Sequence, residues 1–302
     1  MTLLVASSRT VYGCGPSLEE PVRALVSFHD GELGYLRSAR VVPGGGVSSL
    51  LLAGAQRGLY VTPLDRPGAP PEVYPLPRGR QSRRGVNSAV LVGDRLLGGH
   101  SAFGVVAWRR GCDDPPRLVF DAVKENASSV REVQRLPDGR VVFAAGSDLR
   151  TLSPEASTAS SDVIASAPCE ITALEARPGG VVVGTRDGRL LAWDDGDHDL
   201  REIARWGPHP VSAVRAAIFQ GKPYYVVAAK LSGVHASDYD GLEETFYCAQ
   251  ERIRWVAATC DAIFGVEESG RRVLVWSWTR RDRPAGYWTF REPVEALSVS
   301  IS

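Results

Sequence analysis

Residues 170–206, EITALEARPGGVVVGTRDGRLLAWDDGDHDLREIARW, constrain the fold more than any other stretch of this 302-residue chain. The Pro178-Gly179-Gly180 turn is followed by Val181-Val182-Val183, a β-branched run that suits a buried strand. Asp187-Gly188 then has the composition of a tight hairpin turn. Residues 171–174 alternate apolar and polar before the turn, and two further apolar segments, 190–193 and 200–206, follow the hairpin. The stretch therefore predicts four antiparallel strands in about 40 residues, the size of one propeller blade.

The segment VVVGTRDGRLLAWD (181–194) resembles the core of WD-repeat and quinoprotein-like repeats. That resemblance implies a β-propeller and no particular activity, because many unrelated functions share the fold. Trp193-Asp194 matches the Trp-Asp that closes the third strand of a WD repeat. No copy of the unit combines that pair with the Gly-His near the start of such a repeat, which puts membership of the WD-repeat family itself in doubt.

Degenerate copies of the unit recur along the whole chain, at about 43 residues per copy. We expect an all-β fold, a single seven-bladed β-propeller domain over residues 1–302 with four-stranded antiparallel blades; a six- or eight-bladed ring is the alternative. The C-terminal segment 294–300 matches the opening of the central unit, so it should pair into the N-terminal blade and close the ring, which removes two free strand edges. The blades are expected at about residues 294–302 with 1–30, 35–77, 86–123, 129–167, 170–206, 211–249 and 252–290.

The composition argues against several classes of partner. The chain has 35 basic and 35 acidic residues, so no global field favours nucleic acid or a membrane surface. No apolar run approaches the ~18 residues of a membrane span, and the N-terminus lacks the features of a signal peptide. Five cysteines at wide spacings indicate free, mostly buried thiols in a reducing compartment. We expect a cytoplasmic protein, and the scarcity of lysine among the basic residues suggests a bacterial source.

Aligning the innermost strands of the copies identifies one polar position, directly after the first apolar residue, that strand alternation should turn toward the mouth of the central channel. Three arginines in such a ring could form a cationic recess for a carboxylate or another anion, since guanidinium groups bind both oxygens of a carboxylate. Polar residues also line any water-filled propeller channel. The position holds Arg37, Asn87, Arg131, Thr172, Ser212, Arg254 and Glu295.

Two other features could belong to a binding face. The basic loop 78–85 should lie on the same face as the ring, and its arginines are Arg78, Arg80, Arg83 and Arg84. Trp278 could be an exposed interface anchor, although packing is the expectation we favour. Trp108, Trp193 and Trp276 occupy equivalent positions in their copies and should pack between neighbouring sheets.

The chain shows no catalytic motif. Its five histidines fall in different copies without metal-ligand spacing, and His100 is expected to be a hydrogen-bonded turn residue. We therefore expect a protein–protein interaction scaffold without catalysis or cofactor, part of a bacterial multi-protein assembly, that binds a partner with an acidic segment through the loop face and channel mouth. Two alternatives stay open: a small-anion sensor that uses the arginine ring, and a hydrolase or lyase with its site at the channel mouth.

Overall fold

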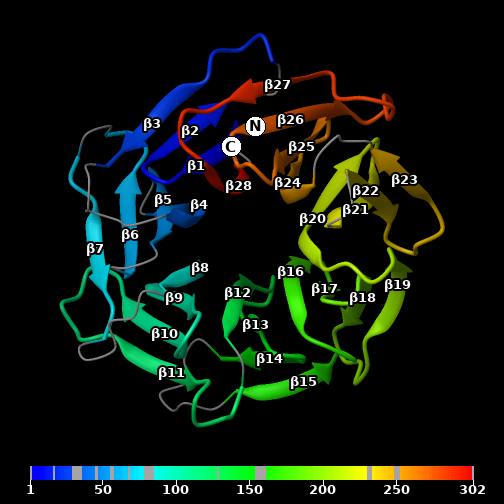
Figure 1. Ribbon diagram of the computed structural model, residues 1–302. Coiled ribbons are helices and arrows are strands. Elements are labelled where there is room, and N and C mark those ends of the chain that lie inside the picture. The colour runs from blue at the N-terminus through cyan, green and yellow to red at the C-terminus, as the bar shows by residue number, and fades with distance from the viewer. Residues whose placement is uncertain are drawn as a thin grey trace.

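The computed structural model describes residues 2–15, 18–28, 36–44, 47–54, 58–66, 69–77, 85–127, 129–153, 161–229, 233–247 and 252–300. Seven four-stranded antiparallel sheets stand around a central axis (Figure 1). The described part of the chain contains strands and no helix, and so no helix that could cross a membrane. The predicted all-β, seven-bladed propeller is confirmed.

Each blade runs from an innermost strand at the channel to an outermost strand at the rim. Blade 1 comprises β28 (Val294–Ser300), β1 (Thr2–Ser7), β2 (Thr10–Cys14) and β3 (Arg23–Ser27). Blade 2 comprises β4 (Leu36–Gly44), β5 (Val47–Gly54), β6 (Gly58–Pro63) and β7 (Glu72–Pro75). Blade 3 comprises β8 (Val86–Val92), β9 (Arg95–His100), β10 (Gly104–Arg109) and β11 (Arg117–Asp121). Blade 4 comprises β12 (Val130–Arg135), β13 (Val141–Ala145), β14 (Asp148–Leu152) and β15 (Asp162–Ser166).

The remaining three blades follow the same order. Blade 5, the central unit, comprises β16 (Ile171–Arg177), β17 (Gly180–Thr185), β18 (Arg189–Asp194) and β19 (Arg201–Arg205). Blade 6 comprises β20 (Val211–Phe219), β21 (Lys222–Ala229), β22 (Val234–Asp238) and β23 (Glu244–Tyr247). Blade 7 comprises β24 (Ile253–Ala258), β25 (Ala262–Glu267), β26 (Arg272–Ser277) and β27 (Gly286–Thr289).

The two ends of the chain meet in blade 1. The C-terminal β28 is the innermost strand and pairs antiparallel with β1, with Leu3 opposite Val299 and Val5 opposite Leu297. This pairing joins blade 7 to blade 2 through one sheet that contains both termini (Figure 1). The ring is therefore closed by backbone hydrogen bonds between segments nearly 300 residues apart in the sequence, as the sequence predicted.

The core lies between blades. The buried apolar residues form seven clusters, and each cluster joins two neighbouring sheets. Trp108, Trp193 and Trp276 are at most 3% exposed, and each packs against the preceding blade, as predicted. Since a single blade cannot cover its own apolar faces, its stability depends on both neighbours.

Of two expectations about individual side chains, one was confirmed and one was wrong. Trp278 is buried and stacks on Phe219 of blade 6, with ring centroids 4.9 Å apart, so the favoured expectation of packing holds and the alternative of an exposed anchor does not. The cysteines are free, but of the four described only Cys14 is buried, while Cys112 and Cys260 are exposed. Cys248 lies outside the described residues.

Glycine permits a close approach between neighbouring blades at two places. A Cβ atom on Gly184 of β17 would lie 2.2 Å from Cγ1 of Val211, the first residue of the innermost strand of blade 6. Gly99 of β9 stands in the same relation to Val130 of blade 4, at 2.8 Å. Side chains at these two positions would push neighbouring sheets apart.

We expect Gly184→Ala to lower the free energy of unfolding by about 1–3 kcal/mol, because the added methyl overpacks this contact. Urea denaturation would measure the change. In a protein that already carries Val211→Ala, the change Gly184→Ala should cost less free energy of unfolding than it does in wild type. Equal stability of Gly184→Ala and wild type would contradict this account of the interface.

Candidate functional site

The polar position identified from the sequence lies at the central channel. All seven of its residues line one cavity of about 1240 Å³ that runs along the axis. They come from the innermost strands of all seven blades: Arg37, Asn87, Arg131, Thr172, Ser212, Arg254 and Glu295. Their placement agrees with the expected ring.

A β-bulge, and not simple alternation, places these residues there. In blade 5, Ile171 pairs with Thr185 and Ala173 with Gly184, which leaves Thr172 as an extra residue in β16. The register shifts at the same place in the other six innermost strands. A bulge bends the strand and re-aims the side chains that follow it.

The three short uncharged residues of the ring donate hydrogen bonds from one blade to the next, and we call them latches. Thr172 donates to the carbonyl oxygen of Val211 at 2.6 Å, and Ser212 to that of Ile253 at 3.1 Å. Asn87 donates through Nδ2 to the carbonyl oxygen of Val130 at 2.9 Å. In each case the acceptor is the first residue of the next innermost strand, so these side chains fix one blade to the next.

The four charged residues of the ring, which we call the mouth residues, are Arg37, Arg131, Arg254 and Glu295. Arg131 is half-exposed and its Nη2 lies 3.0 Å from Oε1 of Glu170. Arg254 forms a looser pair with Glu295, at 3.9 Å. Burial raises the pKa of Glu295, although Arg254 and Arg37 oppose the shift. Arg37 is exposed, and no ion pair holds it among the described residues.

The basic loop of the sequence analysis, with Arg78, Arg80, Arg83 and Arg84, lies outside the described residues. Its contribution to the mouth face stays a prediction.

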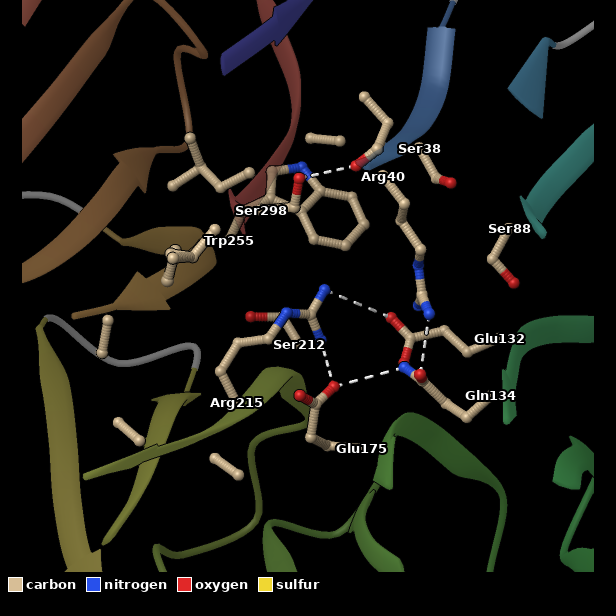
Figure 2. Close-up of a pocket in the computed structure, with 18 of the residues that line it drawn as sticks. Ser38, Arg40, Ser88, Glu132, Gln134, Glu175, Ser212, Arg215, Trp255 and Ser298 are labelled. Atoms are coloured by element: carbon tan, nitrogen blue, oxygen red, sulfur yellow. Dashed lines mark hydrogen bonds and ion pairs between the residues drawn. The ribbon is translucent and has the colours of Figure 1, made fainter. Parts of the chain in front are cut away.

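Deeper in the channel lies a group that the sequence analysis missed. Arg40, Glu132, Gln134, Glu175 and Arg215, which we call the channel network, reach inward from β4, β12, β16 and β20 (Figure 2). Nη1 of Arg40 donates to Oε1 of Gln134 at 2.8 Å, and Nε2 of Gln134 donates to Oε2 of Glu175 at 3.2 Å. Arg215 lies between the two carboxylates, 3.4 Å from Glu175 and 3.9 Å from Glu132.

The two arginines of the network differ in their electrostatic environment. Burial opposes the charge on Arg215, but the adjacent Glu175 and Glu132 outweigh that effect and raise its pKa. Burial lowers the pKa of Arg40, whose described hydrogen-bond partner is a neutral amide. Burial also raises the pKa of Glu175, against Arg215 and Arg40. The network is charge-balanced as a whole, with its pairing concentrated on Arg215.

A spacing of three residues could have revealed four of the five members of the network, all except Glu132. Beyond a bulge, Glu175 follows Thr172 at this spacing into the channel, while the intervening Leu174 is fully buried between sheets. The same spacing separates channel-lining residues in five other innermost strands: Arg37 and Arg40, Arg131 and Gln134, Ser212 and Arg215, Arg254 and Ala257, Glu295 and Ser298. Strict alternation selects positions two apart and therefore misses the second member.

His100 has the environment that the sequence analysis expected. His100 is fully buried, accepts a hydrogen bond from the backbone N–H of Ala102 at 3.0 Å and stacks on Phe103, as a turn residue should. Within the described ranges, no three His, Cys, Asp or Glu side chains gather as metal ligands.

Comparison with known proteins supports the fold. No family model matches the chain, and no curated protein matches it. The computationally designed Ika8 protein is similar in structure, with a TM-score of 0.66 at 17% identity over 99% of this chain and 88% of that one. The extracellular domain of the putative one component system BT4673 from B. thetaiotaomicron has a TM-score of 0.65 at 12% identity. The match covers 87% of this chain and 35% of that one. The WD40 propeller domain of Doa1 gives 0.58 at 12% identity over 70% of each chain. At such identities the likeness shows a propeller fold.

The latches should contribute to stability while Arg37 should not. We expect Thr172→Val to lower the free energy of unfolding by about 1–2 kcal/mol, because it leaves the Val211 carbonyl without its donor. Arg37→Ala, at the equivalent position of blade 2, should change stability by less than about 0.5 kcal/mol. Denaturation of both variants measures the difference, and similar losses would contradict the division of the ring.

His100 should make stability depend on pH. Burial lowers the pKa of His100 to about 4, whereas an imidazole in the unfolded chain titrates near ~6.5. Between these values the unfolded chain binds more protons, so stability falls as the pH decreases. From pH 7 to pH 5 we expect His100 to cost about 2 kcal/mol.

The measurement is urea denaturation of wild type and His100→Gln at both pH values. The variant lacks the imidazole, so its loss over this interval should be smaller by that amount. Parallel losses in the two proteins would show that His100 is not held neutral.

Proposed function

We propose that this protein is a non-catalytic binding module that takes an acidic segment of a partner protein into the mouth of its channel. The proposal rests on the two roles found among the seven residues of the ring. Asn87, Thr172 and Ser212 are engaged as latches, whereas the arginines of the mouth residues extend into the opening with much of their side chains exposed, 50% for Arg131 and 40% for Arg254.

The charge of the lining favours an anionic partner. Five arginines and three glutamates line the cavity, although the whole chain is neutral. Positive charge is therefore concentrated along the axis, where low-dielectric walls focus the field. Arginine is also the side chain best suited to bind both oxygens of a carboxylate.

The dimensions favour an extended segment over a small anion at the ring. The cavity of about 1240 Å³ exceeds the ~300–1,000 Å³ typical of small-molecule sites. Arg131 and Arg254 each have a carboxylate beside them, so an incoming anion must compete for them. A chain with several carboxylates can engage several arginines at once. The proposal retains the expectation of a role within a bacterial cytoplasmic assembly.

A fluorescein-labelled hexaglutamate peptide tests the charge requirement. Anisotropy at low salt should show binding to wild type that weakens as salt is added. The triple variant Arg37→Glu, Arg131→Glu, Arg254→Glu should bind at least tenfold more weakly.

The matched control carries the same charge change on the rim, where Arg117→Glu, Arg201→Glu and Arg205→Glu alter exposed residues of β11 and β19. Its affinity should stay within threefold of wild type. No binding to wild type, or equal losses in the two triple variants, would overturn the proposal.

A further inference from the structure

The channel holds a surplus of hydrogen-bond donors beside Arg40. A guanidinium presents five N–H donors, and within the described ranges only Gln134 accepts from this one. No carboxylate there forms an ion pair with it; the carboxylates of the channel network flank Arg215 instead. Arg40 is thus a largely buried cation with a neutral partner.

Two serines beside Arg40 extend this surplus. The hydroxyl of Ser38, two residues before Arg40 in β4, is buried and has no hydrogen-bond partner among the residues that the structure describes. Ser88 of β8 accepts from the backbone N–H of Val133 at 2.7 Å, and its own hydroxyl hydrogen has no acceptor among the described residues. All three side chains line the cavity, and Figure 2 shows them on one side of the channel. Buried donors without acceptors are rare in folded proteins, so these donors are available to a group that enters the channel.

We propose that Arg40, Ser38 and Ser88 form a second, deeper site that binds a single carboxylate group. This inference goes beyond the proposed function, because it needs no contact with the mouth residues. The group could belong to a free organic acid or to the C-terminus of a peptide that enters the channel, and both would present the same planar monoanion.

The surroundings select a carboxylate over a doubly charged oxyanion. Glu132 and Glu175 stand beside Arg40 as members of the same network, so each negative charge on a ligand meets two carboxylates. The planar guanidinium matches the two oxygens of a carboxylate. The indole of Trp255 also lines the cavity (Figure 2), and its Nε1 has no hydrogen-bond partner within the described ranges. An aromatic surface there suits a ligand whose carboxylate is attached to an apolar body.

Benzoate and benzamide form a matched pair of probes, since they share shape and differ in charge. Titration calorimetry with the full chain should detect one site per molecule for benzoate and none for benzamide. Arg40→Gln should lose at least tenfold in affinity for benzoate, whereas Arg37→Gln, at the mouth, should change it less than twofold. Ser38→Asp keeps Arg40 and supplies an internal carboxylate, so it should also abolish binding and serves if Arg40→Gln does not fold.

Several results would overturn the site: no benzoate binding to wild type, equal binding of benzamide, sulfate binding in preference to benzoate, or an unchanged affinity in both Arg40→Gln and Ser38→Asp.

Acetyl-hexaglycine with a free C-terminus, compared with its amide, separates the two sources of the carboxylate. Binding of the peptide with a free C-terminus in preference to its amide supports a peptide terminus as the ligand. If neither peptide binds while benzoate does, the ligand is a small organic acid. The mouth triple variant should keep benzoate binding while losing hexaglutamate, which separates this site from the proposed function.

Discussion

Packing of each blade against its neighbours is the constraint on which the rest of the structure depends. Each sheet buries apolar side chains on both faces, and the seven clusters occupy the spaces between sheets. Two blades would remain half-uncovered unless the ring closed, and β28 closes it by pairing with β1. Closure holds seven innermost strands around an axis at a distance that their side chains do not fill, and a cavity of about 1240 Å³ remains. The channel is therefore a consequence of the packing, and its lining is free to carry function.

The bulge at the start of each innermost strand divides that lining into two kinds of residue. Short hydroxyl and amide side chains at the bulge donate to the next blade and strengthen the ring. Longer charged side chains at the same position line the cavity without bonding to the next strand, and Arg131 and Arg254 lie beside carboxylates there. Three residues further on, the bend brings Glu175 and Arg215 together across two blades at 3.4 Å. One local backbone feature thus supplies stability, a charged mouth and a polar interior.

The sequence predicted the features that depend on local pattern and repetition. Val181-Val182-Val183 and Asp187-Gly188 indicated the strands and hairpin of blade 5, and the match between residues 294–297 and that unit predicted the closing strand. The channel network was missed because alternation was assumed to continue through the innermost strand, whereas the extra residue at Thr172 interrupts it. Packing was the favoured expectation for Trp278, but its partner could not be named from the sequence. Its contact with Phe219 joins segments about 60 residues apart, which local pattern cannot reveal.

Location of a bound anion in a crystal tests the central claim, that charged side chains left free by the ring make the channel a binding site. Anomalous diffraction from crystals soaked with 4-bromobenzoate would place the bromine directly. The account predicts a peak inside the channel, with the carboxylate against Arg40 and Ser38 and the ring toward Trp255. Bromine peaks confined to arginines on the outer strands, with an unoccupied channel, would contradict it.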